Sequence, residues 1–199
     1  MAGVTAFILA GGKSIRMGRD KAFVPWEGRT LLERALGAVQ AVTPCTRIVG
    51  ARTQFEPYGS VVEDIYSARG PLGGIHAALR ATETDLNLIL AVDLPYVTPA
   101  LLAYLIEQAR ETQNLVTVPH FAAGWEPLCA VYRREFAEVA EGALRAGRNA
   151  IYPLLQGPGV LGIDEAKLVA CGFSTHMFRN INSILDLSAA SDAKALDSK

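Results

Sequence analysis

The chain has 199 residues, of which 50% are hydrophobic, a composition that suits a globular domain with a substantial core and excludes a disordered chain. Lys and Arg number 19 and Asp and Glu 20, so the formal net charge of -1 argues against a general nucleic-acid or membrane-surface role. The most apolar stretch, residues 86–92, is far shorter than the roughly 20 residues of a membrane span, and the N-terminus lacks a signal-peptide pattern. We therefore expect a cytoplasmic protein whose Cys45, Cys129 and Cys171 stay reduced.

Strands and helices alternate along the chain. Apolar runs predict strands at residues 4–9, 46–49, 61–63, 86–92, 115–118 and 128–132. Helical periodicity predicts helices at residues 31–39, 72–81, 99–106 and 136–144, and a last helix opened by Ser183 and Asp186. Thr30 with Glu33 has capping-box spacing, and Thr98-Pro99 is a typical helix start. The pattern predicts one α/β domain over residues 1–199, a three-layer Rossmann-like fold with a mainly parallel sheet and a frayed tail at about 187–199.

A glycine-rich basic loop follows the first strand. Residues 9–21 read LAGGKSIRMGRDK, and four basic residues against one acidic give a local charge of +3 after Leu9. Glycines expose backbone N–H groups to anions, and ligands bind beyond the carboxyl ends of strands in such sheets. The Walker A motif is excluded, because its first glycine would fall on Phe7, and the glycines at 11, 12 and 18 do not fit the dinucleotide fingerprint. Spacing alone leaves a phosphate-binding loop and a solvated surface loop both open.

This loop resembles the L-A-G-G-x-S-x-R-M-G-x-D-K signature of the molybdenum cofactor guanylyltransferases, within the nucleotide-diphospho-sugar-transferase-like superfamily. The resemblance implies that Arg16 and Lys21 face the phosphates. It also implies that backbone atoms of four successive residues contact the guanine and ribose: Leu9, Ala10, Gly11 and Gly12. Related cytidylyltransferases usually begin L-A-A-G, so Gly11 favours guanine.

Asp93 ends the apolar run of residues 86–92 and precedes Leu94-Pro95. A carboxylate beside a buried strand is costly unless it is paired or binds a metal, and Mg²⁺ accepts one or two carboxylates plus waters and phosphates. The alternative is that Asp93 caps the turn before Pro95. The family resemblance implies that Asp93 holds Mg²⁺ and contacts the nucleotide.

Other segments also resemble family elements. Asp64 falls where the family has an aspartate that contacts the nucleotide, and Gly73 and Gly74 either approach the base or shape a turn before a helix. Some relatives carry an asparagine after the second strand, whereas this chain reads VGAR at residues 49–52 and lacks that contact residue. Residues 125–132 (WEPLCAVY) resemble a strand near the acceptor. Asn180 and Asn182, in FRNIN, either bind the pterin acceptor or the metal's waters, or form Asx turns.

The resemblance implies an enzyme that transfers GMP from GTP to the terminal phosphate of molybdopterin, releases pyrophosphate and uses Mg²⁺. The residues proposed as catalytic are Arg16, Lys21 and Asp93. Its partners would be GTP, molybdopterin, other cofactor-biosynthesis proteins and acceptor apoenzymes, with neither nucleic acid nor membrane. Three alternatives remain: a molybdopterin cytidylyltransferase, a guanylyltransferase for another phosphorylated acceptor such as a corrinoid, and a non-catalytic nucleotide-binding module.

Overall fold

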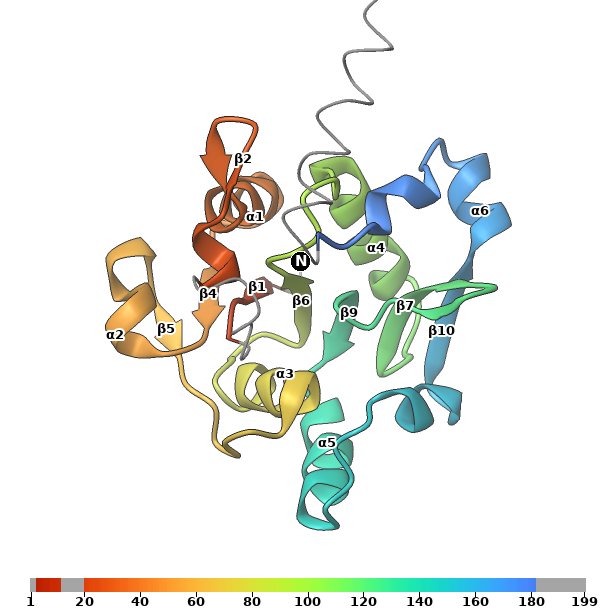
Figure 1. Ribbon diagram of the computed structural model, residues 1–199. Coiled ribbons are helices and arrows are strands. Elements are labelled where there is room, and N and C mark those ends of the chain that lie inside the picture. The colour runs from red at the N-terminus through yellow and green to blue at the C-terminus, as the bar shows by residue number, and fades with distance from the viewer. Residues whose placement is uncertain (1–2, 12–19, 182–199) are drawn as a thin grey trace, which may run out of the picture.

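A computed structural model describes residues 3–11 and 20–181 of the chain (Figure 1). The strands are β1 (Val4–Leu9), β2 (Pro25–Trp26), β3 (Arg29–Thr30), β4 (Thr46–Val49), β5 (Val61–Val62), β6 (Leu86–Ala91), β7 (Val116–Phe121), β8 (Gly124–Trp125), β9 (Cys129–Arg133) and β10 (Val160–Asp164). The α-helices are α1 (Leu31–Gln40), α2 (Arg52–Phe55), α3 (Gly70–Arg80), α4 (Pro99–Arg110), α5 (Phe136–Arg145) and α6 (Glu165–Ala170). Short 3-10 turns are η2 (Lys21–Phe23), η3 (Glu56–Tyr58), η4 (Tyr152–Gln156) and η5 (Thr175–Phe178). Within these ranges no helix combines the length and apolarity needed to cross a bilayer.

The main sheet is mostly parallel, as the alternation of strands and helices predicts. Its strand order is β10-β7-β9-β6-β1-β4-β5, with β8 paired to β7 in a hairpin. β1 runs parallel to β4 and β6, β4 to β5, and β7 to β10. β9 is antiparallel to both neighbours, β6 and β7. The carboxyl ends of β1, β4, β5 and β6 therefore meet at one edge, where ligands bind in open α/β sheets.

Two helical layers enclose the sheet. The apolar faces of α1, α4 and α6 pack with one side of the sheet, and those of α3 and α5 with the other. On the central strand β6, Leu88 and Leu90 face the first layer and Ile89 faces the second, the alternation that a strand buried on both faces requires. Figure 1 shows α1 and α4 above the sheet and α3 and α5 below it. The three-layer α/β fold is confirmed.

Local signals account for the starts of α1 and α4. Thr30 accepts a hydrogen bond from the Glu33 N–H at 3.2 Å, and the Glu33 carboxylate accepts one from the Thr30 N–H at 2.7 Å, so the predicted capping box is formed. Thr98 caps α4 through the Leu101 N–H at 3.4 Å, with Pro99 at the first helical position.

The structure differs from the predicted elements in several places, and the short elements β2, β3, β8 and α2 were not predicted. α3 begins at Gly70, so Gly73 and Gly74 lie buried inside the helix, and the alternative in which they shape a turn before a helix at Leu72 is wrong. β10 and α6 were not predicted, although Asp164 caps α6 through the Lys167 N–H at 2.7 Å. The predicted helix at Ser183 and the tail at 187–199 lie outside the described residues.

Candidate active site

Lys21 and Asp93, 72 residues apart, form an ion pair at the carboxyl edge of the sheet. The distance from Lys21 Nζ to Asp93 Oδ2 is 2.7 Å. Asp93 follows β6 by two residues, and Lys21 is the first residue of η2. Their side chains are 15% and 23% exposed, so the pair is shielded yet still reachable from solvent. Two residues that the sequence assigns to phosphate and metal binding are thus in contact.

Asp20 fixes the place of Lys21. One carboxylate oxygen of Asp20 accepts the Ala22 N–H at 2.9 Å and so caps η2. The other accepts a hydrogen bond from Gln54 Nε2 at 2.7 Å, which connects η2 to α2 across the sheet edge. The signature aspartate therefore orients the lysine that follows it, a positioning role that the sequence does not reveal.

The end of β1 lies against the end of β4. The N–H groups of Ala10 and Gly11 both donate to the Val49 carbonyl, at 3.0 and 3.1 Å. A Cβ on Gly11 would lie 3.4 Å from Gly50 Cα, so the two backbones approach closely. Because these two N–H groups already donate to the Val49 carbonyl, they are not available to bind an anion. The prediction that backbone N–H groups of this loop bind phosphate therefore concerns residues 12–19 only. Those residues, which include Gly12 and Arg16, lie outside the described part of the chain.

Gly74 brings α3 next to two other predicted nucleotide contacts. A Cβ at Gly74 would lie 3.4 Å from Leu9 Cδ2 and 3.8 Å from Asp64 Oδ1. Leu9, Asp64 and Gly74 therefore lie next to one another at the end of β1. The Asp64 side chain is exposed there, yet partial removal from water raises its pKa.

The FRNIN segment, where it is described by the structure, also lies at this edge. The Ile181 N–H donates to the Asp93 carbonyl at 3.1 Å, and the Ile181 side chain is buried. Asn180, one residue earlier, is exposed. Asn180 is thus held beside the loop that carries Asp93, whereas Asn182 lies outside the described residues.

Glu126 is a further charged residue at this edge, and sequence reasoning did not single it out. It is half-buried between β8 and β9. Burial, with the nearby negative charge of Asp93, raises the pKa of Glu126 to about 6. Its charge in turn adds to the burial that raises the pKa of the Cys129 thiol. The spacing along the chain gives no sign of this, because the proximity of Glu126 to Asp93 arises from the pairing of β6 with β9.

The donor set at this edge fits a hard divalent cation. The Lys21 ammonium already lies against Oδ2 of Asp93, so this carboxylate oxygen is accessible to a cation. Among the described residues no group of three or more His, Cys, Asp or Glu could hold a metal by itself. Mg²⁺ does not need such a cage, since it commonly binds one or two carboxylates and completes its shell with water and substrate phosphates.

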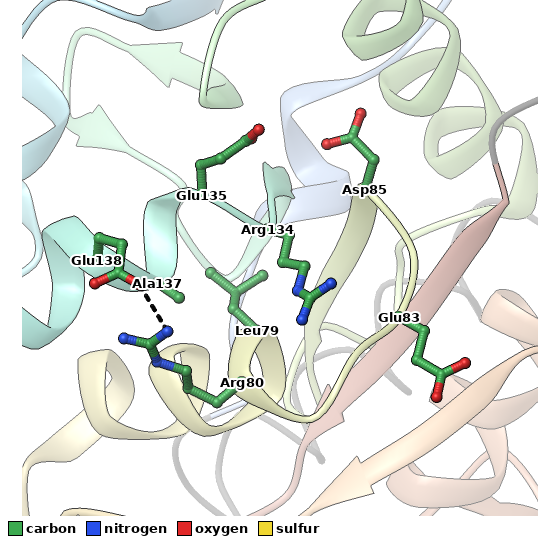
Figure 2. A pocket seen from close by; sticks show the side chains of 8 residues that line it. All are labelled: Leu79, Arg80, Glu83, Asp85, Arg134, Glu135, Ala137 and Glu138. Atoms are coloured by element: carbon green, nitrogen blue, oxygen red, sulfur yellow. Dashed lines mark hydrogen bonds and ion pairs between the residues drawn. The ribbon is translucent and has the colours of Figure 1, made fainter.

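A separate pocket of about 630 Å³ lies at the opposite end of β6 (Figure 2). It is lined by Leu79, Arg80, Glu83, Asp85, Arg134, Glu135, Ala137 and Glu138. Arg80 pairs with Glu138 at 2.7 Å, the dashed line in Figure 2. Asp85 precedes β6 whereas Asp93 follows it, so the pocket is away from the ligand-binding edge of the sheet, and none of the predicted site residues lines it. We therefore place the candidate active site around Lys21 and Asp93.

Comparison with known sequences gives consistent matches. The family described as the MobA-like NTP transferase domain matches residues 6–157. A molybdenum cofactor guanylyltransferase of Desulfosudis oleivorans is 36% identical over 197 residues, covering 97% of this chain and 96% of the relative. A probable molybdenum cofactor guanylyltransferase of Pelotomaculum thermopropionicum is 34% identical over 191 residues, covering 92% and 89%.

Solved structures show the same fold. Molybdopterin-guanine dinucleotide biosynthesis protein A of Archaeoglobus fulgidus has a TM-score of 0.83 and 27% identity, covering 96% of this chain and 98% of that one. The 2-C-methyl-D-erythritol 4-phosphate cytidylyltransferase of Thermus thermophilus has a TM-score of 0.69 at 17% identity, covering 98% and 100%. The second similarity concerns the fold alone.

Proposed function

The chain belongs to the MobA-like NTP transferase domain family, and from this membership we propose that it transfers GMP from GTP to the terminal phosphate of molybdopterin, releasing pyrophosphate. The observation that carries the proposal is the Lys21–Asp93 ion pair at the carboxyl edge of the sheet. This pair supports the proposal because a cation and a carboxylate lie together at the edge of the sheet where ligands bind in open α/β folds.

Two anions must be brought together in this reaction. The acceptor phosphate needs no strong base, because its second pKa of about 6 leaves it largely ionised near neutral pH. When bound, a divalent ion, which we propose is Mg²⁺ on Asp93, would neutralise phosphate charge. Lys21 and Arg16 hold the phosphate oxygens and offset the charge of the departing pyrophosphate. Asp20 keeps Lys21 in place, so orientation supplies part of the rate.

The nucleotide side of the proposal involves Leu9, Ala10, Gly11, Gly12, Asp64 and Gly74. Gly11 and Gly74 carry no side chain and lie at the end of β1, next to Gly50 and next to Leu9 and Asp64, which supports backbone contact with a base and ribose there. We propose that the base is guanine, in keeping with Gly11 and with the names of the relatives. Asn180 and Asn182 are proposed for the acceptor side, because the segment that contains them is bonded to the Asp93 loop.

The nucleotide can be tested without the acceptor. Thermal unfolding is measured with Mg²⁺ and either GTP or CTP over a concentration series. A ligand that binds the folded state alone raises stability by about 2.7 kcal/mol at 100 times its Kd, so the preferred nucleotide gives the larger shift. We expect GTP to stabilise more than CTP. Equal or greater stabilisation by CTP would favour a cytidylyltransferase.

Transfer itself is tested with molybdopterin, GTP and Mg²⁺. We expect pyrophosphate release and a pterin product heavier by one GMP moiety in mass spectrometry. Binding of GTP without turnover would instead indicate a nucleotide-binding module. Replacing molybdopterin by a phosphorylated corrinoid distinguishes the remaining acceptor class.

A further inference from the structure

Glu126 lies across the end of a strand pair from Asp93. In the antiparallel ladder of β6 and β9, Leu86 pairs with Arg133 and Leu90 with Cys129. The Ala91 N–H continues this ladder with a hydrogen bond to the Leu128 carbonyl at 2.7 Å. β6 ends at Ala91 and β9 begins at Cys129, so Asp93 and Glu126 each lie two residues beyond this last bond, in the turn after β6 and the turn before β9. These two turns thus carry two carboxylates at the same edge of the sheet.

The Glu126 side chain has no structural task that explains it. Its backbone N–H donates to the Pro119 carbonyl at 3.0 Å, and its own carbonyl accepts from the Cys129 N–H at 3.1 Å. Any residue except proline could form both of these bonds. No side chain in residues 3–11 or 20–181 forms a hydrogen bond or ion pair with its carboxylate. A half-buried carboxylate beside a second carboxylate is unfavourable unless a cation compensates it.

A divalent cation would supply that compensation. Lys21 Nζ lies 2.7 Å from Asp93 Oδ2 and offsets the charge of that carboxylate. The remaining negative charge of the two carboxylates is therefore that of Glu126. Mg²⁺ and Mn²⁺ bind one or two carboxylate oxygens and take their other ligands from water and phosphate. We propose that Glu126 is a second carboxylate of the metal site at Asp93 and binds the cation directly or through a metal-bound water. This inference rests on the proposed function, because it assumes a metal-dependent nucleotidyltransferase.

The test measures Mn²⁺ binding by loss of the free-ion paramagnetic resonance signal, with the full chain, with GTP and without acceptor. The variants are Glu126→Gln, Asp93→Asn and a matched control, Glu83→Gln, which changes an exposed carboxylate at the opposite end of β6. We expect Glu126→Gln to weaken Mn²⁺ binding by about 10–100-fold and Glu83→Gln to leave it unchanged. Wild-type affinity in Glu126→Gln would overturn the proposal. If Glu126→Gln instead raises only the KM for the pterin, Glu126 is an acceptor contact and the proposal fails.

A stability measurement keeps the inference testable independently of turnover. In metal-free protein, Glu126→Gln removes repulsion from Asp93, so its melting temperature should equal or exceed that of the wild type. Added Mn²⁺ and GTP should then stabilise this variant less than the wild type and the Glu83→Gln control. An equal metal-induced shift in all three proteins would contradict the assignment. Failure of the proposed function would appear differently, as absence of GMP transfer by the wild type while the Mn²⁺ difference persists.

Discussion

Lys21 and Asp93 show how much of the candidate site rests on single side chains. The ammonium lies 2.7 Å from the carboxylate, and Asp20 and Gln54 hold the turn that presents it. The sequence identifies Lys21 and Asp93 because each stands in a recognisable local pattern. It does not identify Glu126, whose importance arises only when β9 pairs with β6 in antiparallel register. Proximity between strands is a property of the pairing and not of either segment alone.

Lys21→Ala should reduce the rate of transfer while leaving the fold intact. The loss of one charge-assisted phosphate contact is expected to lower kcat by about 10²–10³-fold. The control is Lys167→Ala, which removes an exposed lysine of α6 and should retain full activity. The measurement is steady-state pyrophosphate release from GTP in the presence of acceptor. Comparable activity in both variants would remove Lys21 from the proposed machinery.

Gly74→Ala separates binding from stability. The added Cβ would meet Leu9 Cδ2 at 3.4 Å, an ordinary contact, and alanine is favoured over glycine in helices by about 0.5–1 kcal/mol. The variant should therefore be as stable as the wild type or slightly more so. If the nucleotide contacts Gly74 beside Asp64, GTP should bind about tenfold more weakly to the variant, equivalent to about 1.4 kcal/mol. Gly142→Ala in α5, where a Cβ meets nothing within 4 Å, is the control for helix propensity. Unchanged GTP affinity in Gly74→Ala, by titration calorimetry, would place the nucleotide elsewhere.

At the scale of elements, α3 and α5 are joined by a charged network around a buried histidine. The His76 side chain is 2% exposed and packs against the Tyr66 ring at 5.3 Å. Its Nε2 lies 3.7 Å from Glu141 and accepts a hydrogen bond from Arg80 at 3.4 Å. Burial lowers the pKa of His76, opposed by the charges of Glu141 and Glu138 and assisted by that of Arg80.

This pKa shift predicts how stability changes with pH. Because the folded state holds the pKa of His76 below the usual value of about 6.5, the unfolded chain takes up the proton first. The stability due to neutral His76 is present above that value and is lost as the pH falls through the folded pKa. Urea unfolding at pH 7 and pH 5 should therefore show a smaller loss for His76→Gln than for the wild type. An equal loss in both proteins would show that His76 does not contribute.

The elements themselves were predicted where local signals dominate. The capping box at Thr30, the Thr98-Pro99 start and the apolar runs of β1 and β6 gave their helices and strands directly. The alternative in which Gly73 and Gly74 shape a turn is wrong, since Gly70, which lies in the left-handed region at φ 63°, already begins α3. β10 was missed because Gly162 interrupts its apolar pattern, and that glycine is required by the Trp125 ring 3.0 Å from where a Cβ would lie.

For the whole molecule, we propose that the chain unfolds as one domain. The main sheet includes both the first strand, β1, and the last, β10, and both helical layers pack on it. The two tryptophans report on opposite layers, since Trp26 packs with the α1 side and Trp125 with the α3 side. Urea transitions followed by fluorescence in Trp26→Phe and in Trp125→Phe should each coincide with the far-ultraviolet circular dichroism transition of the same variant. Separate midpoints for the two probes within one variant would indicate two units.

The fold also explains why we propose that the reaction takes place at one edge of the sheet. Parallel strands deliver the end of β1, the end of β4 and Asp93 to the same side, and the segment at Asn180 returns to it through the Ile181–Asp93 backbone bond. No single segment could have revealed this convergence, although the alternation of strands and helices predicts the edge at which it occurs.

The measurement that tests the central claim most directly follows labelled phosphorus from GTP. Wild-type protein is incubated with Mg²⁺, molybdopterin and GTP labelled at either the α or the γ phosphorus, with Asp93→Asn in parallel. Nucleotidyl transfer predicts that the α label enters the pterin product, the γ label leaves in pyrophosphate, and Asp93→Asn loses the transfer. Appearance of the γ label in the pterin, or equal α-label transfer by Asp93→Asn, would contradict the account.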